Sequence, residues 1–214
     1  MRIAVLGTGT VGRTLADGLR GRGHRVTVGT RDPERADVAA WSAESGLPVL
    51  PFESVAEEAG LVVNATAGAA SLAVLERVGG HVDGRVLLDV ANPLDTSRGF
   101  PPSLIPQPGG TSLAEQIQAA HPRSAVVKAL NTVNASVMTE PGALPGLHHL
   151  PVCGDDEDAK DVVVGLLTEL GWRRDQVLDL GGLVAARGME AYLLFWVSVL
   201  GAVGTPRFNV RVVR

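Results

Sequence analysis

The sequence contains a single cysteine, Cys153, among its 214 residues. One thiol cannot close a disulfide within the chain or complete a cysteine-based metal site. Free cysteine is commonly buried, so we expect Cys153 to be a packed, unreactive side chain. The acidic run Asp155–Asp158 has no histidine spacing beside it and suits the start of a helix, whose dipole favours negative charge. No metal site is therefore expected.

Positive charge is also scarce, with 19 basic against 23 acidic residues and a formal net charge of −4. This balance argues against a nucleic-acid partner bound through a large basic surface. The most apolar stretch, residues 191–204, is 14 residues long. It is shorter than the roughly 18–20 residues that span a bilayer, so we expect a buried helix and no membrane partner. The first residues, Met1–Val5, follow a strand pattern and not a signal-peptide layout, which predicts a cytoplasmic protein.

Runs rich in valine, isoleucine and leucine recur along the chain, separated by segments of helix length. Runs without polar alternation are typical of strands covered on both faces, as in a parallel βαβ sheet. We therefore predict an α/β Rossmann fold with a doubly wound parallel sheet. The predicted strands are Arg2–Leu6, Arg25–Val28, Leu61–Thr66, Val86–Val90, Ala125–Leu130 and Leu150–Cys153.

The pattern changes after Pro145. A strand into Gly154 is followed by a predicted helix over residues 157–170, a short strand over 176–180 and the apolar helix from about Val184. We place a domain boundary here, between a Rossmann domain of residues 1–145 and a small C-terminal α/β domain of residues 146–214.

A glycine-rich motif follows the first predicted strand and opens the first predicted helix. It reads Gly7-Thr8-Gly9-Thr10-Val11-Gly12. In this context the glycines allow a tight turn, close approach of a pyrophosphate and close helix–strand packing. The helix N-terminus adds N–H donors and a positive dipole end. The motif predicts dinucleotide binding by all six residues.

The end of the second strand indicates which dinucleotide binds. NAD-preferring domains place an acid here, about 20 residues after the motif, whereas this chain has Thr30 and Arg31, with Arg35 one helical turn further. A hydroxyl and two guanidinium groups suit a 2′-phosphate, which favours NADP(H). The alternative is that Asp32 holds the ribose. We consider it weaker because Asp32-Pro33 is typical of a helix start.

Two further strand ends point to the same edge of the sheet, where ligands of doubly wound folds bind. The small residues Ala65, Thr66 and Ala67 allow a flat ring to approach, and Asn92 could fix a carboxamide. A proline-rich segment over residues 99–110 follows, which we predict to be an irregular loop beside the ligand cleft.

Together these segments resemble the coenzyme F420-dependent NADP oxidoreductases, and the resemblance covers nearly the whole chain. The run Pro151–Asp156 is more distinctive than the phosphate-binding motif, which many Rossmann enzymes share. The segments that carry the resemblance are Met1–Gly12, Val28–Arg31, Val127–Val133, Leu150–Asp156 and Leu178–Leu183.

The resemblance implies hydride transfer between NADP(H) and a deazaflavin, coenzyme F420, whose rings stack between the two domains. It places Thr8 at the pyrophosphate, Thr30, Arg31 and Arg35 at the 2′-phosphate, and four residues near the rings: Asn131, Thr132, Val133 and Ala135. The chain departs from the family pattern at Asn131 and Asn134, where members often carry histidine and proline. No catalytic acid or base is expected, because direct hydride exchange needs mainly proximity and orientation.

We therefore expect an NADP-dependent oxidoreductase that acts on a small-molecule redox partner, most specifically coenzyme F420. An NADPH-dependent reductase of another flavin or of a small organic substrate is the alternative enzyme. A third hypothesis, from a different class, is a Rossmann protein that senses NADPH without turnover.

The apolar helix from Val184 to Val203 also predicts assembly. Its apolar residues cover nearly all faces of a helical wheel, and such a helix must be buried all round. A small C-terminal domain offers few partners for it, so we predict a homodimer with Phe195 or Trp196 in the contact. The alternative is that the Rossmann sheet of the same chain covers the helix.

Overall fold

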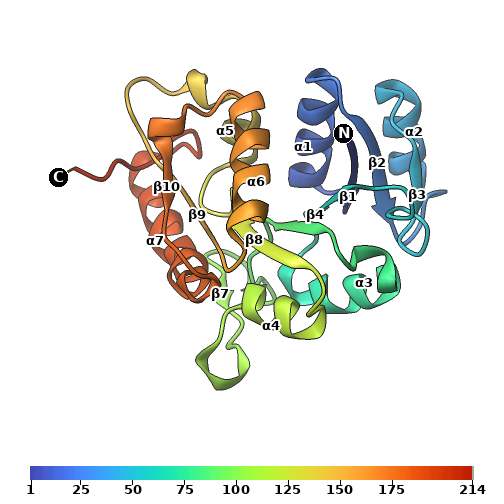
Figure 1. Cartoon of the computed structure of the whole chain (residues 1–214). Coiled ribbons are helices and arrows are strands. Elements are labelled where there is room, and N and C mark those ends of the chain that lie inside the picture. The colour runs from blue at the N-terminus through green and yellow to red at the C-terminus, as the bar shows by residue number, and fades with distance from the viewer. Residues whose placement is uncertain (214) are drawn as a thin grey trace.

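The protein is built around one eight-stranded sheet (Figure 1). The structure is a computed structural model that describes residues 1–213. The strand order is β10-β9-β8-β5-β4-β1-β2-β3, and all neighbours are parallel except the antiparallel pair β8–β9. The strands are β1 Arg2–Leu6, β2 Arg25–Thr30, β3 Val49–Pro51, β4 Leu61–Asn64, β5 Val86–Asp89, β8 Ala125–Ala129, β9 Leu150–Gly154 and β10 Val177–Asp179.

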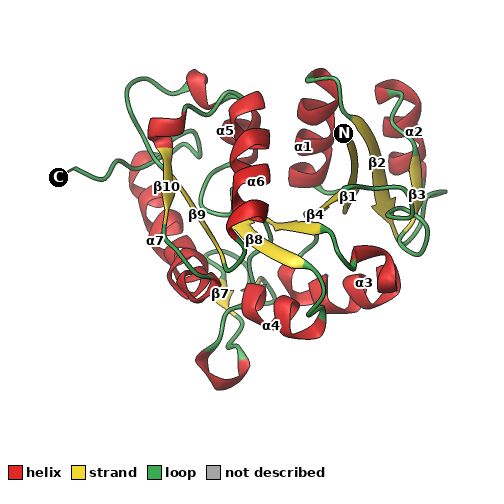
Figure 2. Ribbon diagram, viewed as in Figure 1, coloured by secondary structure: helices red, strands yellow, loops and turns green. Residues whose placement is uncertain are grey.

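Helices cover both faces of this sheet (Figure 2). One face packs against α1 Thr10–Gly21, α2 Ala36–Ser45, α5 Ala135–Thr139 and α6 Glu157–Glu169. The other packs against α3 Ser71–Val78, α4 Leu113–Ala120 and α7 Ala186–Val203. Burial on both faces explains why the central strands are continuous apolar runs. The predicted Rossmann α/β fold is confirmed, and all six predicted strands are present.

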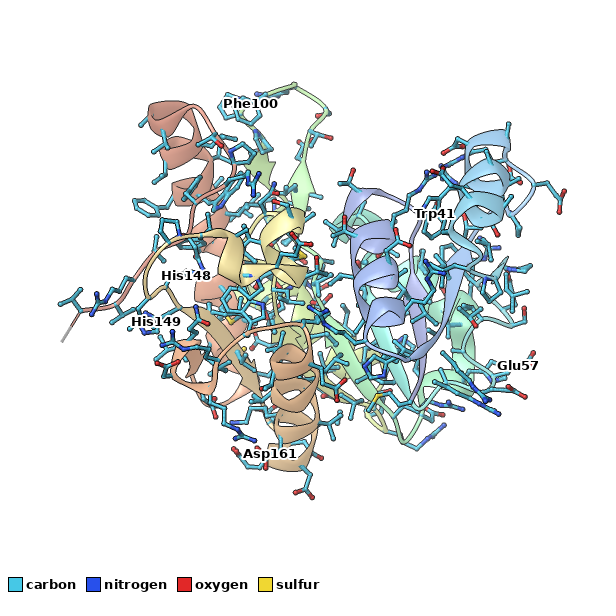
Figure 3. The ribbon with its side chains drawn as sticks, turned by 90° about the horizontal axis from the view of Figure 1, so that it is seen from above. Trp41, Glu57, Phe100, His148, His149 and Asp161 are labelled. Atoms are coloured by element: carbon cyan, nitrogen blue, oxygen red, sulfur yellow. The ribbon has the colours of Figure 1, made fainter. Side chains whose placement is uncertain are left out.

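Three short strands were not predicted. The proline-rich segment is more regular than expected, because β7 Ser103–Leu104 pairs antiparallel with β6 Leu94–Asp95. Figure 3 places the exposed Phe100 at the outer end of this hairpin. Proline lacks the N–H that a strand ladder needs, so Pro101, Pro102 and Pro106 keep β7 to two residues. The third strand, β3, adds three residues at the sheet edge beside β2.

The predicted helix start at Asp32-Pro33 is wrong. Helix α2 begins at Ala36, with Arg35 as its N-terminal flanking residue, and Pro33 lies in a turn before it. The reason for setting Asp32 aside as a ribose ligand therefore no longer applies, and Asp32 is judged below by its position.

The sheet continues across the predicted domain boundary. Strands β9 and β10 lie beyond residue 145, and β9 pairs with β8 through Lys128–Cys153 and Ala129–Val152. Residues 146–214 thus add their strands to the Rossmann sheet. The division into a 1–145 domain and a 146–214 domain stays a prediction.

Helix α7, Ala186–Val203, agrees with the predicted helix from Val184 to Val203 but is less buried than expected. The apolar segment is Leu183–Val203, which has 21 residues. By length and composition alone it could cross a membrane, and 28% of its most apolar 18-residue window is buried. The 14-residue stretch from Ala191, on which the argument against a membrane span depended, is only part of this segment. The helix is also not buried all round within one chain: Phe195 is 55% exposed, and only Ala186, Met189, Glu190 and Val197 are buried.

Cys153 lies in β9 and is buried, as predicted. Burial raises the pKa of its thiol to about 12. The thiolate is the reactive form, so we expect no labelling by a disulfide reagent at pH 8 in the native protein. One thiol per chain should react once the protein is unfolded in urea. Fast labelling without denaturant would contradict this.

Candidate nucleotide and hydride-transfer site

The three glycines of the motif have different roles. Gly7 has φ +112°, and a Cβ there would lie 2.7 Å from the Ala65 carbonyl oxygen. A Cβ on Gly12 would overlap the carbonyl oxygen of Gly7, so this glycine lets α1 pack against the turn. Gly9 has open space where its Cβ would be and stands just before α1. Thr10 opens the helix. An anion can therefore approach the helix N-terminus at Gly9.

Two cavities lie along the carboxyl ends of the strands. The first, of about 310 Å³, extends from the glycine turn to the end of β2 and is lined by Gly7, Thr8, Gly9, Thr30, Arg31, Arg35, Phe52, Ala65, Thr66, Ala67, Ala70 and Val74. The second, of about 280 Å³, shares Ala65–Ala67 and continues along Val11, Gly68, Val90, Ala91, Asn92, Leu94 and Thr96. The two form a long site suited to an extended ligand.

The end of the first cavity carries positive charge. Thr30 is buried, while Arg31 is exposed and has no side-chain partner among the described residues. The Arg35 Nε lies 2.5 Å from Asp37 Oδ1, so part of this guanidinium is already engaged. Asp32 is exposed and does not line the cavity. This end therefore offers two guanidinium groups, which can form charge-assisted hydrogen bonds with a phosphate.

Asn131 is hydrogen-bonded to Asn92, which lines the second cavity. Leu130, at φ +65°, turns the chain after β8 and brings the two asparagines together. Asn92 Nδ2 donates to the Asn131 carbonyl at 2.9 Å, and Asn131 Nδ2 donates to Asn92 Oδ1 at 2.9 Å and to the Met189 carbonyl at 3.0 Å. Asn131 Oδ1 is buried without a partner among the described residues. Val133 and Ala135 are buried beside this turn.

Thr132 lines a third, mostly apolar cavity of about 290 Å³ between α7, β9, β10 and the C-terminal segment. Its buried Oγ1 has no partner among the described residues, and neither has the Tyr192 hydroxyl. The other lining residues are His149, Pro151, Leu178, Leu180, Ala185, Gly188, Met189, Val210 and Val212. The turn at Asn131–Thr132 therefore carries two buried polar atoms without a partner among the described residues, and Thr132 lines the third cavity.

A buried charged cluster beneath the second cavity was missed. Lys128 is fully buried, and its Nζ donates to Asp89 at 2.7 Å, to Glu190 at 3.0 Å and to the Ala91 carbonyl at 2.5 Å. Glu190 also accepts from the backbone N–H groups of Leu113 and Ala114 at the start of α4. The cluster joins β5, β8, α4 and α7 directly under the wall formed by Ala91 and Asn92. A lysine within the apolar strand Ala125–Ala129 was the available signal.

Burial alone would lower the pKa of Lys128, but the two adjacent carboxylates outweigh it and leave the pKa raised. From Asp89 the network continues towards the cavity: Asn64 Nδ2 donates to Asp89 Oδ1 at 2.8 Å, and Thr66 Oγ1 donates to Asn64 Oδ1 at 2.6 Å. A charged lysine thus fixes side chains that line the site.

The acidic run Asp155–Asp158 has structural partners. Asp155 accepts from the Leu183 N–H at 2.7 Å, Asp156 caps α6 through the Ala159 N–H, and Glu157 pairs with Lys160. Over residues 1–213, no three metal-ligating side chains gather.

Comparison with known proteins identifies relatives of this chain. The family model described as NADP oxidoreductase, coenzyme F420-dependent, matches residues 2–93. A crystal structure of an Arthrobacter sp. FB24 protein assigned to the F420-dependent NADP-reductases is 48% identical, covers 100% of both chains and has a TM-score of 0.94. The F420-dependent NADP reductase of Methanocaldococcus jannaschii is 29% identical over 89% of this chain and 88% of its own length.

Rat metalloreductase STEAP3 is also 29% identical over 89% of this chain, but the chain spans only 36% of that protein's length. The match at 48% identity covers the whole of this chain, including the glycine turn, the residues that line both cavities and the C-terminal part. These findings confirm an NADP-dependent oxidoreductase, for which the family implies NADP(H) and F420 as cofactors. The chain belongs to the family of coenzyme F420-dependent NADP oxidoreductases.

Proposed function

We propose that this protein transfers a hydride between NADP(H) and the deazaflavin coenzyme F420. The observation that carries the proposal is the pairing of a long nucleotide cavity with two buried polar atoms that lack partners among the described residues, Asn131 Oδ1 and Thr132 Oγ1. These atoms lie at the turn where the family resemblance places the two rings.

In this proposal the nucleotide follows the two joined cavities. The pyrophosphate lies at Thr8–Gly9 and the N-terminus of α1, and the 2′-phosphate lies between Thr30, Arg31 and Arg35. The nicotinamide occupies the second cavity, against Val11, Ala65–Ala67 and Asn92.

The acceptor side fits a flat, largely apolar ring with polar edges. Thr132 and Tyr192 line a cavity with mostly apolar walls, and the buried hydroxyl of each has no partner among the described residues. Buried polar groups are normally hydrogen-bonded, so an orphaned hydroxyl favours a ligand that supplies the partner. Asn131, which stands where the family often has histidine, can still bind a ring edge through Oδ1.

The residues of this chain bind and orient, and none is assigned as an acid or base. When both cofactors are bound, they supply the donor and acceptor carbons of the hydride transfer. The Asn92–Asn131 pair holds one wall, and the Lys128 cluster holds Ala91 beneath it. Orientation of this kind accounts for a large share of the barrier lowering in bound-pair reactions.

The test is a visible spectrum. We expect a mixture of protein, NADPH and oxidised F420 to lose the deazaflavin absorbance at a rate proportional to enzyme. A Thr132→Val variant should slow this reaction while leaving NADPH affinity unchanged, because it removes only the hydroxyl. Binding of NADPH without bleaching of any acceptor would instead support a nucleotide sensor.

A second candidate is reduction of another flavin or of a small oxidised substrate by NADPH. The match to a metalloreductase over 89% of this chain favours it. Parallel assays with FMN, FAD and a ferric chelate separate the two candidates. Turnover of one of these, with F420 left unchanged, would replace the first proposal.

We also propose a cytoplasmic homodimer formed through α7, without a membrane span. The first half of α7 packs in the protein, where Glu190 caps α4 and Arg187 pairs with Glu115. The second half leaves Phe195 and Val203 exposed. Large exposed apolar patches usually mark interfaces, and two-fold dimers are the commonest assembly.

The assembly can be tested at Phe195. We expect light scattering to give twice the 22.2 kDa of one chain, and Phe195→Glu to give a folded monomer. Trp196 is less informative because it stacks on Phe208 of its own chain at 5.1 Å. A monomeric native protein at micromolar concentration would reject the dimer, and a dimeric Phe195→Glu variant would reject this contact.

A further inference from the structure

Asp37 lies at the meeting point of two arginines that approach from different elements. It is in the first turn of α2, and its side chain is 57% exposed. Arg35 donates from Nε to Asp37 Oδ1 at 2.5 Å and from Nη2 to Oδ2 at 3.1 Å. Arg13 of α1 donates to the same Oδ2 at 2.7 Å. One carboxylate therefore holds two guanidinium groups in place.

Arg13 extends this contact to the glycine turn. Its Nε donates to the Thr8 carbonyl at 2.8 Å, and its guanidinium lies over the Trp41 ring at 5.1 Å from the centroid. Figure 3 shows Trp41 on the outer helix beside α1. With both ring and carboxylate contacts, Arg13 has a fixed orientation and fixes the peptide between Thr8 and Gly9.

Arg35 extends the contact in the other direction, because it lines the nucleotide cavity. Its paired contact with Asp37 uses Nε and Nη2 and leaves Nη1 available to a ligand. The hydrogen bond from Arg35 holds the pKa of Asp37 below its ordinary value, so the carboxylate stays ionised near neutral pH. Arg31, by contrast, has no such anchor among the described residues.

We propose that Asp37 is a specificity-determining positioning residue that joins the 2′-phosphate end of the site to the pyrophosphate turn. It orders Arg35 before the nucleotide arrives, so less side-chain entropy is lost on binding. Through Arg13 it also holds the turn that receives the pyrophosphate. The inference rests on the proposed placement of NADP(H).

The negative charge of Asp37 also acts against nucleotide binding, because it repels the phosphate. Two arginines pair with this single carboxylate, so the local charge of the three side chains is positive. The carboxylate is also exposed to solvent, where salt screens its longer-range effect. Orientation of Arg35 is therefore expected to outweigh repulsion.

Calorimetric titration with NADPH and NADH tests the inference. We expect Asp37→Ala to weaken NADPH binding about fivefold or more and NADH binding less, so that the preference falls. Arg13→Gln should weaken both nucleotides by similar factors, because the pyrophosphate turn serves both. Combining Asp37→Ala with Arg35→Ala should lower the NADPH preference no further than Arg35→Ala does alone.

The exposed Asp161 of α6 provides a matched control, since Asp161→Ala removes the same charge from a helix that does not line the nucleotide cavities. Unchanged or tighter NADPH binding by Asp37→Ala would overturn the inference. Asp37→Asn serves as the second variant if Asp37→Ala does not fold, with the same criterion. A wild-type protein without any NADPH preference would instead reject the proposed nucleotide placement itself.

Discussion

Replacing Lys128 with methionine is expected to lower the free energy of unfolding by about 3–5 kcal/mol, the usual cost of removing one partner from a buried ion pair. The Lys128 side chain is fully buried, and so is that of Asp89. The substitution leaves Asp89 and Glu190 without their cation, and burial of an uncompensated carboxylate is costly. Urea unfolding followed by circular dichroism measures the difference.

Lys160, the second of the chain's two lysines, provides the control. The Lys160 side chain is itself buried, but its partners Glu157 and Asp179 are 81% and 52% exposed. Both carboxylates therefore stay hydrated without the lysine, and Lys160→Met should cost about 1 kcal/mol or less. Adding Asp89→Asn to Lys128→Met should recover part of the loss, because asparagine keeps the acceptor for Asn64. Equal losses of unfolding free energy for the two lysine variants would show that the buried cluster stabilises the fold no more than the ion pairs of Lys160 do.

The second large effect is expected at Arg31. We predict that NADP(H) binds at least tenfold more tightly than NAD(H), about 1.4 kcal/mol or more. Arg31→Ala should remove most of this preference, because the 2′-phosphate loses a charge-assisted partner. Titration calorimetry of the native protein and of Arg31→Ala, each with NADPH and NADH, gives the ratio of the two affinities directly.

Arg174, an exposed arginine in the C-terminal part of the chain, is the control for this measurement. Arg174→Ala removes the same charge and should leave the preference intact. If Arg31→Ala also keeps it, the phosphate site has been misplaced. The alternative in which Asp32 binds the ribose would then be the hypothesis to test, although Asp32 does not line the cavity.

Local patterns predicted most of the fold. Valine- and leucine-rich runs located six strands because both faces of those strands are buried. The three-residue β3 has too few residues to show any pattern, and its pairing with β2 depends on the rest of the sheet. How much of α7 is covered by its own chain could not be predicted for a related reason, since that depends on where the helix lies relative to α4.

The candidate site was predictable where its chemistry is local. The glycine turn and the tip of β2 are each a short continuous run of sequence, and both line one cavity. The Lys128 cluster joins residues 39 and 62 positions apart, and no spacing rule links them. Asp37 was missed because an exposed acid near a helix start is ordinarily a favourable dipole contact.

The hydrogen-bonded pairing of β8 with β9 also limits how this protein can move. Residues on the two sides of the predicted boundary share one strand ladder, so they cannot rotate against each other as rigid lobes about a hinge. Many oxidoreductases close two lobes around their substrates, and that opening and closing can limit turnover. The two cavities at the strand ends are therefore expected to keep their shape without a closing motion of the two parts.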